Sequence, residues 1–182
     1  MDEAEAEIRR AKELDPLSLI INSGSGDMLY IRKKYVQAIQ QYRKTLELDP
    51  NFAEAQLWMG KCYRQKGMFV EAIADFQKAR KDFGNTPYGL GDLGNTYALS
   101  GEKTKAIEVL RNLLELSKQG YSLNYDIAFI YCGLGDKDTA FEYLEKAYNE
   151  KEEMGDFKVD PAWESLRSDP RYKSLLERMN LE

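Results

Sequence analysis

The stretch "LELDP" at residues 46–50 decides the fold, because the similar "KELDP" stands 34 residues earlier, at residues 12–16. The same interval separates the members of four further series. Two series stay small: Gly26, Gly60, Gly94 and Ala128, and Ala38, Ala72, Ala106 and Ala140. Two stay large: Leu29, Tyr63, Tyr97 and Tyr131, and Tyr42, Phe76, Leu110 and Leu144. Small positions that face large ones at fixed offsets are typical of closely packed helices, so we predict an array of helical repeats.

Each repeat has the composition of two helices joined by a turn. In one repeat, "AEAQLWMGKCYRQ" (53–65) and "VEAIADFQKARKD" (70–82) flank the short turn "KGMF". The turn position holds a glycine in three repeats and a lysine in the first: Gly67, Gly101, Gly135 and Lys33. Glycine ends helices there because it adopts left-handed backbone angles without steric cost. We therefore predict eight helices in four pairs, one additional N-terminal helix, and a C-terminal cap of one or two short helices.

The period, the small and aromatic positions and the "ELDP" ending together resemble the tetratricopeptide repeat family, over about Asp2 to Lys151. The resemblance implies an all-α, right-handed α-solenoid. Its predicted organisation is a truncated repeat's second helix (1–16), repeats 19–52, 53–86, 87–120 and 121–152, and a cap (153–182), as one solenoid domain. The family's tryptophan near the start of each first helix is replaced here, by Asn22, Gln56, Leu90 and Asn124.

The glycine-rich stretch "SGSGD" (23–27) is open to three interpretations: a phosphate loop, a linker or part of a helix. Gly26 occupies the small position of the first repeat, which places the stretch in the middle of a helix. No strand precedes it and no Gly-Lys-Ser/Thr follows, which excludes a phosphate loop. Gly24 and Ser25 have no packing reason to be small, so we expect this helix to be the least stable of the array.

The two ends of the chain differ from the repeats between them. Residues 2–14 match a second helix, with Ala4 at the small and Ile8 at the large position, but no first helix precedes them. We expect on this basis that further repeats or another domain lie upstream in a longer protein. The tail 159–181 breaks the period, and we predict that it forms the cap through its apolar residues: Trp163, Leu166, Tyr172, Leu175, Leu176 and Met179.

The order of motifs also resembles a narrower group, the C-terminal repeat regions of large bacterial signalling proteins, and "LRSDPR" (166–171) is the most characteristic part. In that group a winged-helix, adenylate-cyclase or serine/threonine kinase domain precedes the repeats. The resemblance implies a sensor or scaffold region, and carries over no catalytic or DNA-binding residue.

Composition excludes several classes of function. The formal charge of −5 provides no basic surface for nucleic acid, and no apolar run is long enough to span a membrane. We expect a soluble segment, with the cytoplasm favoured and the periplasm possible. The absence of histidine removes Ser-His-Asp and Cys-His sites and the commonest zinc ligand, so we predict no enzyme, no metal and no cofactor. Cys62 and Cys132 are predicted to be unbonded.

In such an array the first helices line a concave face, so we expect a protein or peptide partner to bind in this groove. The predicted groove residues are Asp27, Tyr30, Leu57, Lys61, Arg64, Gln65, Tyr88, Asn95, Leu99, Tyr125 and Phe129. Lys61 and Arg64, three apart on one helix, are predicted to bind a partner's carboxylate together with Asn95. The alternative for this basic pair is an ion pair with neighbouring acids such as Glu54. The alternative for the whole chain is self-association through its N-terminal half-repeat or apolar tail.

Overall fold

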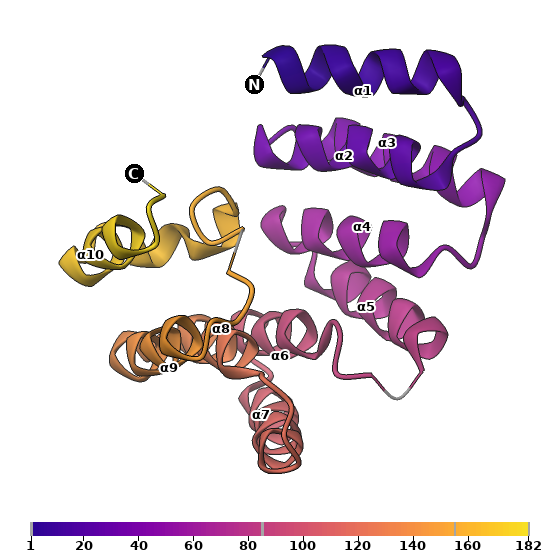
Figure 1. The fold of residues 1–182 in the computed structure, drawn as a ribbon. Helices are drawn as coiled ribbons and strands as arrows, with labels where there is room; N and C mark the ends of the chain where they lie inside the picture. Colours follow the sequence, from indigo (N-terminus) through magenta and orange to yellow (C-terminus); the bar gives the residue numbers. More distant parts are fainter. Residues whose placement is uncertain (1, 85, 155, 182) are drawn as a thin grey trace. The chain divides into compact units, whose positions relative to one another are not determined.

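The computed structural model describes residues 2–84, 86–154 and 156–181, without the side chains of residues 2, 4 and 5. All regular structure in these ranges is helical and none is β-strand, which confirms the predicted class (Figure 1). The helices are α1 (Asp2–Leu14), α2 (Leu19–Ile31), α3 (Tyr35–Leu48), α4 (Ala53–Gln65), α5 (Phe69–Phe83), α6 (Leu90–Leu99), α7 (Lys103–Lys118), α8 (Asn124–Leu134), α9 (Lys137–Asn149), the 3₁₀ helix η1 (Pro161–Leu166) and α10 (Pro170–Arg178).

The chain divides into two compact units, Met1–Thr86 and Pro87–Glu182. In the first unit α2 packs on α3 and α4 on α5, while α1 packs on α2 (Figure 1). In the second unit α6 packs on α7 and on α8, and α8 packs on α9. These are the four predicted pairs, with the additional N-terminal helix and the cap.

Glycines at the small positions allow the two helices of a pair to approach closely. A Cβ atom added to Gly60 would lie 2.8 Å from Cε1 of Phe76, and one added to Gly26 would overlap the ring of Tyr42. Both rings are fully buried. In these two repeats the small and large positions therefore face each other, and the glycine makes room for an aromatic ring of the paired helix. In the third repeat a Cβ atom added to Gly94 would instead meet Ile130 of α8 and Val109 of α7.

The turn position adopts the left-handed conformation in all four repeats. The φ angles are 72°, 86° and 83° at Gly67, Gly101 and Gly135, and 58° at Lys33. A side chain disfavours this conformation, so the first repeat adopts the turn of the others at a steric cost that glycine avoids.

An amide side chain takes the tryptophan position in three of the four repeats. In α2 the Nδ2 of Asn22 donates to the carbonyl oxygens of Pro16, at 2.8 Å, and Ser18, at 2.9 Å. In α4 the Nε2 of Gln56 donates to Oδ1 of Asp75, and its Oε1 accepts from Lys78 at 3.0 Å. Hydrogen bonds to the preceding turn or to the paired helix thus attach these helix starts where the family uses an aromatic ring.

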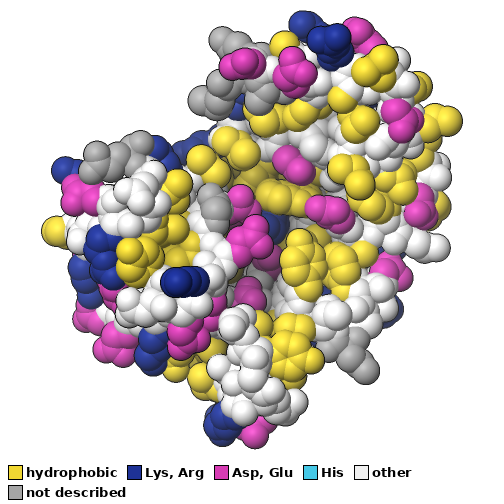
Figure 2. All heavy atoms as spheres, viewed as in Figure 1, with side chains coloured by type: hydrophobic (Ala, Val, Ile, Leu, Met, Phe, Trp, Pro, Cys, Tyr) yellow, Lys and Arg dark blue, Asp and Glu magenta, His cyan; other side chains and the backbone are white. Residues whose placement is uncertain are grey.

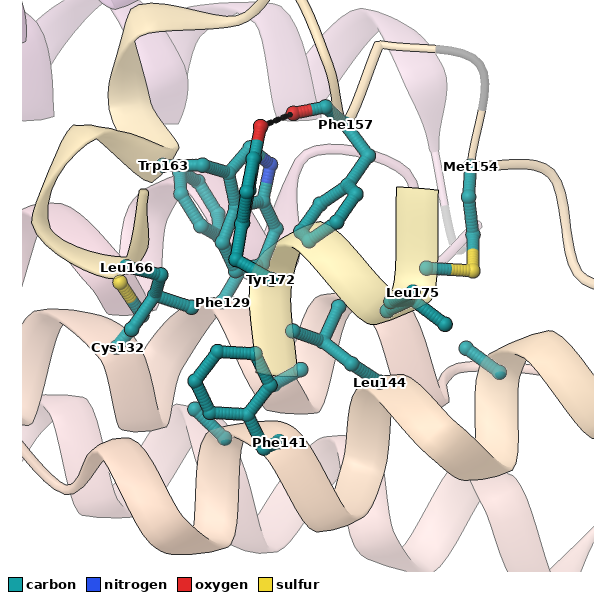
Figure 3. Close-up of a cluster of buried hydrophobic side chains, with 13 residues drawn as sticks. Phe129, Cys132, Phe141, Leu144, Met154, Phe157, Trp163, Leu166, Tyr172 and Leu175 are labelled. Carbon is teal, nitrogen blue, oxygen red and sulfur yellow. Dashed lines mark hydrogen bonds between the residues drawn. The ribbon is translucent and has the colours of Figure 1, made fainter. Parts of the chain in front are cut away.

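The C-terminal tail forms the cap that the sequence predicts. Both Asp-Pro pairs start helices, since the Asp160 side chain accepts from the Ala162 N–H at 2.8 Å and Asp169 accepts from the Arg171 N–H at 3.0 Å. Four of the six predicted apolar residues are buried and two partly buried, in one cluster with residues of α8 and α9 (Figure 3).

Both cysteines are buried thiols that form no disulfide bond, as predicted. Burial, with the nearby Asp27 carboxylate as the next cause, raises the pKa of the Cys62 thiol to about 12. The thiol therefore stays protonated at neutral pH, and Cys62 is a packing residue rather than a nucleophile.

At the N-terminus, α1 lies against α2, and the predicted large residue Ile8 is half-buried. The predicted small position, Ala4, lies outside the described side chains. A Cβ atom added to Gly24 of α2 would lie 4.0 Å from Cδ1 of Ile8, which is an ordinary contact. Gly24 is therefore small without a packing need, unlike Gly26.

Two alanine substitutions on α2 separate helix propensity from packing. Gly24→Ala should raise the free energy of unfolding by about 0.5–1 kcal/mol, because it removes backbone freedom and adds an ordinary contact. Gly26→Ala gains the same propensity but forces its methyl group into the Tyr42 ring, and should lower that free energy by about 1–3 kcal/mol. Urea denaturation of both variants measures this, and equal effects of the two substitutions would contradict the close approach.

Asp75 should make stability depend on pH. Burial raises the pKa of this carboxyl to about 6, although the Gln56 hydrogen bond and the charges of Lys78 and Arg43 lower it. Near pH 5 folded Asp75 therefore keeps a proton that the unfolded chain has lost. The resulting stabilisation is complete below about pH 4 and is lost as pH rises through about 6.

Asp75→Asn mimics the protonated carboxyl at every pH. Near pH 4 its free energy of unfolding should equal that of the parent chain. At pH 7 its free energy of unfolding should be about 1–2 kcal/mol higher, a difference that is reduced because the Asp75 side chain is partly exposed to water. Denaturation between pH 4 and 8 measures the difference between the two proteins. Asp82→Asn, at an exposed carboxylate of the same helix, is the control. A pH-independent difference for Asp75→Asn would contradict the shifted pKa.

Candidate functional site

The predicted groove residues are divided between the two units, and each set is considered in its own unit. The first unit holds Asp27, Tyr30, Leu57, Lys61, Arg64 and Gln65, and the second holds Tyr88, Asn95, Leu99, Tyr125 and Phe129. Some of these side chains reach the surface and others are buried in contacts within their unit.

An aromatic and cationic cluster connects α2 with α4 in the first unit. The Tyr30 and Trp58 rings meet edge to face with centroids 5.3 Å apart, and Lys61 Nζ lies 4.1 Å from the Trp58 centroid. Gln65 donates to the Tyr30 hydroxyl at 3.5 Å. Tyr30 was predicted to line an open groove, but it is only 1% exposed because it packs against Trp58, which corrects that prediction. Trp58, Lys61 and Gln65 are partly exposed. We call these four residues the Trp58 platform.

The prediction from sequence missed Trp58, although a signal for it was present. Trp58 precedes Lys61 by three residues, and positions three apart lie on one helix face. A lysine over an indole ring gains a cation–π attraction and holds its charge beside an apolar surface. The platform therefore offers an indole ring, an ammonium group and an amide within two turns of α4, a combination suited to a side chain that is partly apolar and partly acidic.

Asp27 is half-exposed and held by a buried partner. The Tyr42 hydroxyl donates to Oδ1 of Asp27 at 2.6 Å. Burial, followed by the charge of Asp27, raises the pKa of Tyr42 far above its usual value. Tyr42 therefore remains a donor at physiological pH and fixes the orientation of the carboxylate.

The prediction that Leu57 and Arg64 line an open groove is wrong. Both side chains are buried, with Arg64 only 3% exposed. The Arg64 guanidinium lies 5.8 Å from the centroid of the Phe76 ring, so this side chain turns towards α5, on which α4 packs. Lys61 remains partly exposed, and the two residues do not form a shared exposed basic surface.

Asn95 of α6 has a structural partner instead of an exposed amide. Its side chain is 2% exposed, and Nδ2 donates to the backbone carbonyl of Phe129 at 2.8 Å. This hydrogen bond joins α6 to α8. The amide N–H group is therefore used within the protein and does not point to a ligand. Asn95 was predicted to offer a donor to a ligand, and the structure corrects that prediction.

Tyr125 and Phe129 of α8 are covered by the chain's own tail, which corrects their prediction as groove residues. The Trp163 ring lies 5.1 Å from Tyr125 and 4.8 Å from Phe129 between centroids (Figure 3 shows Trp163 and Phe129). The Trp163 indole N–H donates to the Tyr125 hydroxyl at 2.8 Å. Burial and the charge of Asp160 raise the pKa of Tyr125 well above its usual value, so the hydroxyl stays neutral. These two rings hold Trp163 rather than a partner's side chain.

The loop after α9 fixes the start of α8 beneath the cap. Glu152 accepts hydrogen bonds from the backbone N–H groups of Asn124, at 3.0 Å, and Tyr125, at 2.9 Å. The Asn124 side chain donates to Glu152 at 2.7 Å and to Glu150 at 2.9 Å. Carboxylates at a helix N-terminus satisfy its first N–H groups and oppose its dipole.

Tyr88 and Leu99 are the remaining predicted residues of the second unit, and both are exposed.

Over the residues described, no group of three or more histidine, cysteine or acidic side chains is placed to hold a metal ion. Within those same ranges no helix combines the length and hydrophobicity that crossing a bilayer requires.

Comparison with known proteins identifies repeats along most of the chain. A "TPR repeat" model matches residues 26–67, and "Tetratricopeptide repeat" models match 54–86, 90–120 and 121–154. A curated relative is the probable UDP-N-acetylglucosamine–peptide N-acetylglucosaminyltransferase SPINDLY of Hordeum vulgare, 27% identical over 135 residues. The match takes in 70% of this chain but 14% of that protein.

Solved structures of similar fold include three proteins. MamA is 26% identical with a TM-score of 0.56, over 83% of this chain and 88% of its own. The protein TTC0263 of Thermus thermophilus is 20% identical with a TM-score of 0.69, over 97% and 90%. YrrB, described as a TPR protein with an unusual peptide-binding site, is 18% identical with a TM-score of 0.55, over 96% and 92%. At 20% and 18% identity, the last two show likeness of fold alone.

Substitutions at Trp163 test how firmly the tail covers α8. Trp163→Ala should lower the free energy of unfolding by about 3–5 kcal/mol, because it empties a buried site lined by aromatic rings. Tyr125→Phe, which removes only the acceptor of the indole hydrogen bond, should cost about 1–2 kcal/mol. Urea denaturation measures both. A loss below about 1 kcal/mol for Trp163→Ala would mean that the tail is only loosely attached.

Proposed function

Because this chain belongs to the tetratricopeptide repeat family, we propose that it is a protein-interaction module that binds a segment of a partner protein. Proteins of this family generally mediate protein–protein interactions. The observation that supports a binding role most directly is the Trp58 platform, where a partly exposed indole ring carries a lysine ammonium 4.1 Å above its centre.

The platform favours a partner side chain of mixed character. A large apolar group gains area against Trp58, and aromatic residues carry much of the binding energy in protein interfaces. A carboxylate beside that group gains a charge-assisted hydrogen bond from Lys61. We therefore propose that the partner segment presents an acidic residue next to a large apolar one.

The exposed surface of the first unit is consistent with this role. On the face shown in Figure 2, hydrophobic side chains reach the surface at several places over α1–α4. Among solved structures of similar fold, YrrB has a peptide-binding site according to its description. Its low identity carries no residue correspondence, so the platform is proposed from this chain's own geometry.

The proposal includes no catalysis by this chain, which has no histidine. The chain spans 14% of the length of the barley relative, so that protein's transferase activity is not transferred to it. We further propose that the module serves a larger bacterial signalling protein, as the resemblance of the tail "LRSDPR" suggests.

Self-association is a second candidate function, favoured by one surface feature. Leu14, Leu17 and Ile20, around the connection from α1 to α2, are largely exposed. Exposed apolar clusters of this kind often mark protein interfaces. Multi-angle light scattering over a range of concentrations tests this candidate, with Leu17→Glu and Ile20→Glu as variants. A monomer at the highest concentration would exclude it.

Binding at the platform is tested with a synthetic array of peptides that carry an acidic residue beside a large apolar one. For selected peptides, Lys61→Ala should weaken binding by about 1–3 kcal/mol, since it removes a charge-assisted hydrogen bond. Trp58→Phe should weaken it less, because it keeps an aromatic surface. Isothermal titration calorimetry measures both variants.

The matched control is Lys118→Ala, which removes an exposed lysine of the second unit paired with Glu115. Its affinity should equal that of the parent chain. If no peptide is selected, or if Lys61→Ala and Trp58→Phe bind as tightly as the parent, the platform is not the binding site.

A further inference from the structure

A pocket of the first unit lies where the connection from α2 to α3 meets the end of α4. Its volume is about 330 Å³, and it opens to solvent. The lining residues are Lys33, Lys34, Tyr35, Val36, Gln37 and Lys66. None of them belongs to the Trp58 platform, so this pocket is independent of the function proposed above.

Three lysines from two successive repeats converge on this pocket. Lys33 and Lys34 belong to the turn of the first repeat, and Lys66 directly follows α4 in the second. All three are exposed. The chain as a whole carries a formal charge of −5, so the pocket concentrates positive charge on an acidic protein and attracts anions to one place.

The start of α3 adds to this positive potential. Lys34 is the N-cap residue, no side chain caps the helix, and its first turn contains no acidic residue. The N-terminus of a helix carries a partial positive charge, so lysine is electrostatically unfavourable there. In the fourth repeat, the equivalent N-cap residue is Asp136, whose carboxylate accepts from the Thr139 N–H at 3.1 Å. An anion in the pocket of the first repeat would supply the negative charge that Asp136 provides in the fourth.

Lys33 also departs from the other repeats. It adopts a left-handed conformation, with φ at 58°, at a position where three repeats have glycine. A side chain costs about 1 kcal/mol in this conformation. The turn itself therefore does not require a lysine at this position. Lys33 does, however, give the pocket its third ammonium group.

We propose that this pocket binds an oxyanion of the phosphate type through Lys33, Lys34, Lys66 and the N-terminus of α3. Lysine ammonium groups and helix N-termini both favour such anions. The ion can come from two sources, free inorganic phosphate or a phosphorylated side chain of a partner. Tyr35 and the exposed Val36 provide an apolar wall beside the lysines, which favours a phosphate carried on an organic group.

The experiment compares three probes on the whole chain by isothermal titration calorimetry at constant ionic strength. The probes are inorganic phosphate, a short phosphotyrosine peptide and the same peptide without phosphate. Saturable binding of phosphate or the phosphopeptide, but not of the unphosphorylated peptide, is the expected result. A phosphopeptide that binds about tenfold or more tighter than inorganic phosphate would identify a partner's side chain as the source, because its apolar part adds contact area. Equal affinities would identify the free ion.

The test variant is Lys34→Asp combined with Lys66→Ala. It exchanges an unfavourable N-cap for a favourable one, so it should fold at least as stably as the parent, and thermal denaturation checks this. Its affinity for the bound probe should fall about tenfold or more. The control, Lys118→Ala, should bind like the parent. If neither phosphate probe binds saturably, or if the double variant binds as tightly as the parent, the proposal is overturned.

Discussion

The close approach of paired helices over glycine is the interaction on which the rest of this structure depends. Gly26 and Gly60 leave room for the buried rings of Tyr42 and Phe76, and a Cβ atom at either position would collide with the ring. Large residues can fill the interior between two helices only where the opposite helix is small. The approach in turn sets which faces of α2 and α4 are turned towards α3 and α5, and leaves their other faces for contacts such as that of Tyr30 with Trp58.

The cap shows how a repeat array uses the same kind of surface in two ways. In the second unit the aromatic residues of α8 are covered by Trp163, whose indole group is bound by the Tyr125 hydroxyl. In the first unit Trp58 stays partly exposed beside Lys61. Aromatic rings on first helices are therefore covered by the chain itself in the second unit and left partly exposed in the first, where we propose that a partner binds.

Predictions of the candidate site from sequence succeeded only in part. Helical spacing placed Lys61, Gln65 and Leu99 at the surface, where the first two are partly exposed and the third is exposed. Tyr88 is also exposed, but it lies in the turn before α6 and not on a first helix. Arg64, Asn95 and Phe129 were assigned to the groove but are buried, because helix spacing defines a face without showing what covers it. Asn95 meets a backbone carbonyl of the neighbouring α8, a partner 34 residues away in the sequence. Such partners depend on side-chain packing, which a periodic pattern does not specify.

The sequence by itself determined the helices, their pairing, the left-handed turns and the cap, because each depends on local residue type or on a repeated spacing. It also determined that the two cysteines form no disulfide bond, since they are few and two repeats apart. Only the tertiary structure decided that amides replace the family's tryptophans by hydrogen bonding, that Trp163 covers α8, and that three lysines share a pocket. These features join segments far apart in the chain, and their geometry is set by how the helices pack.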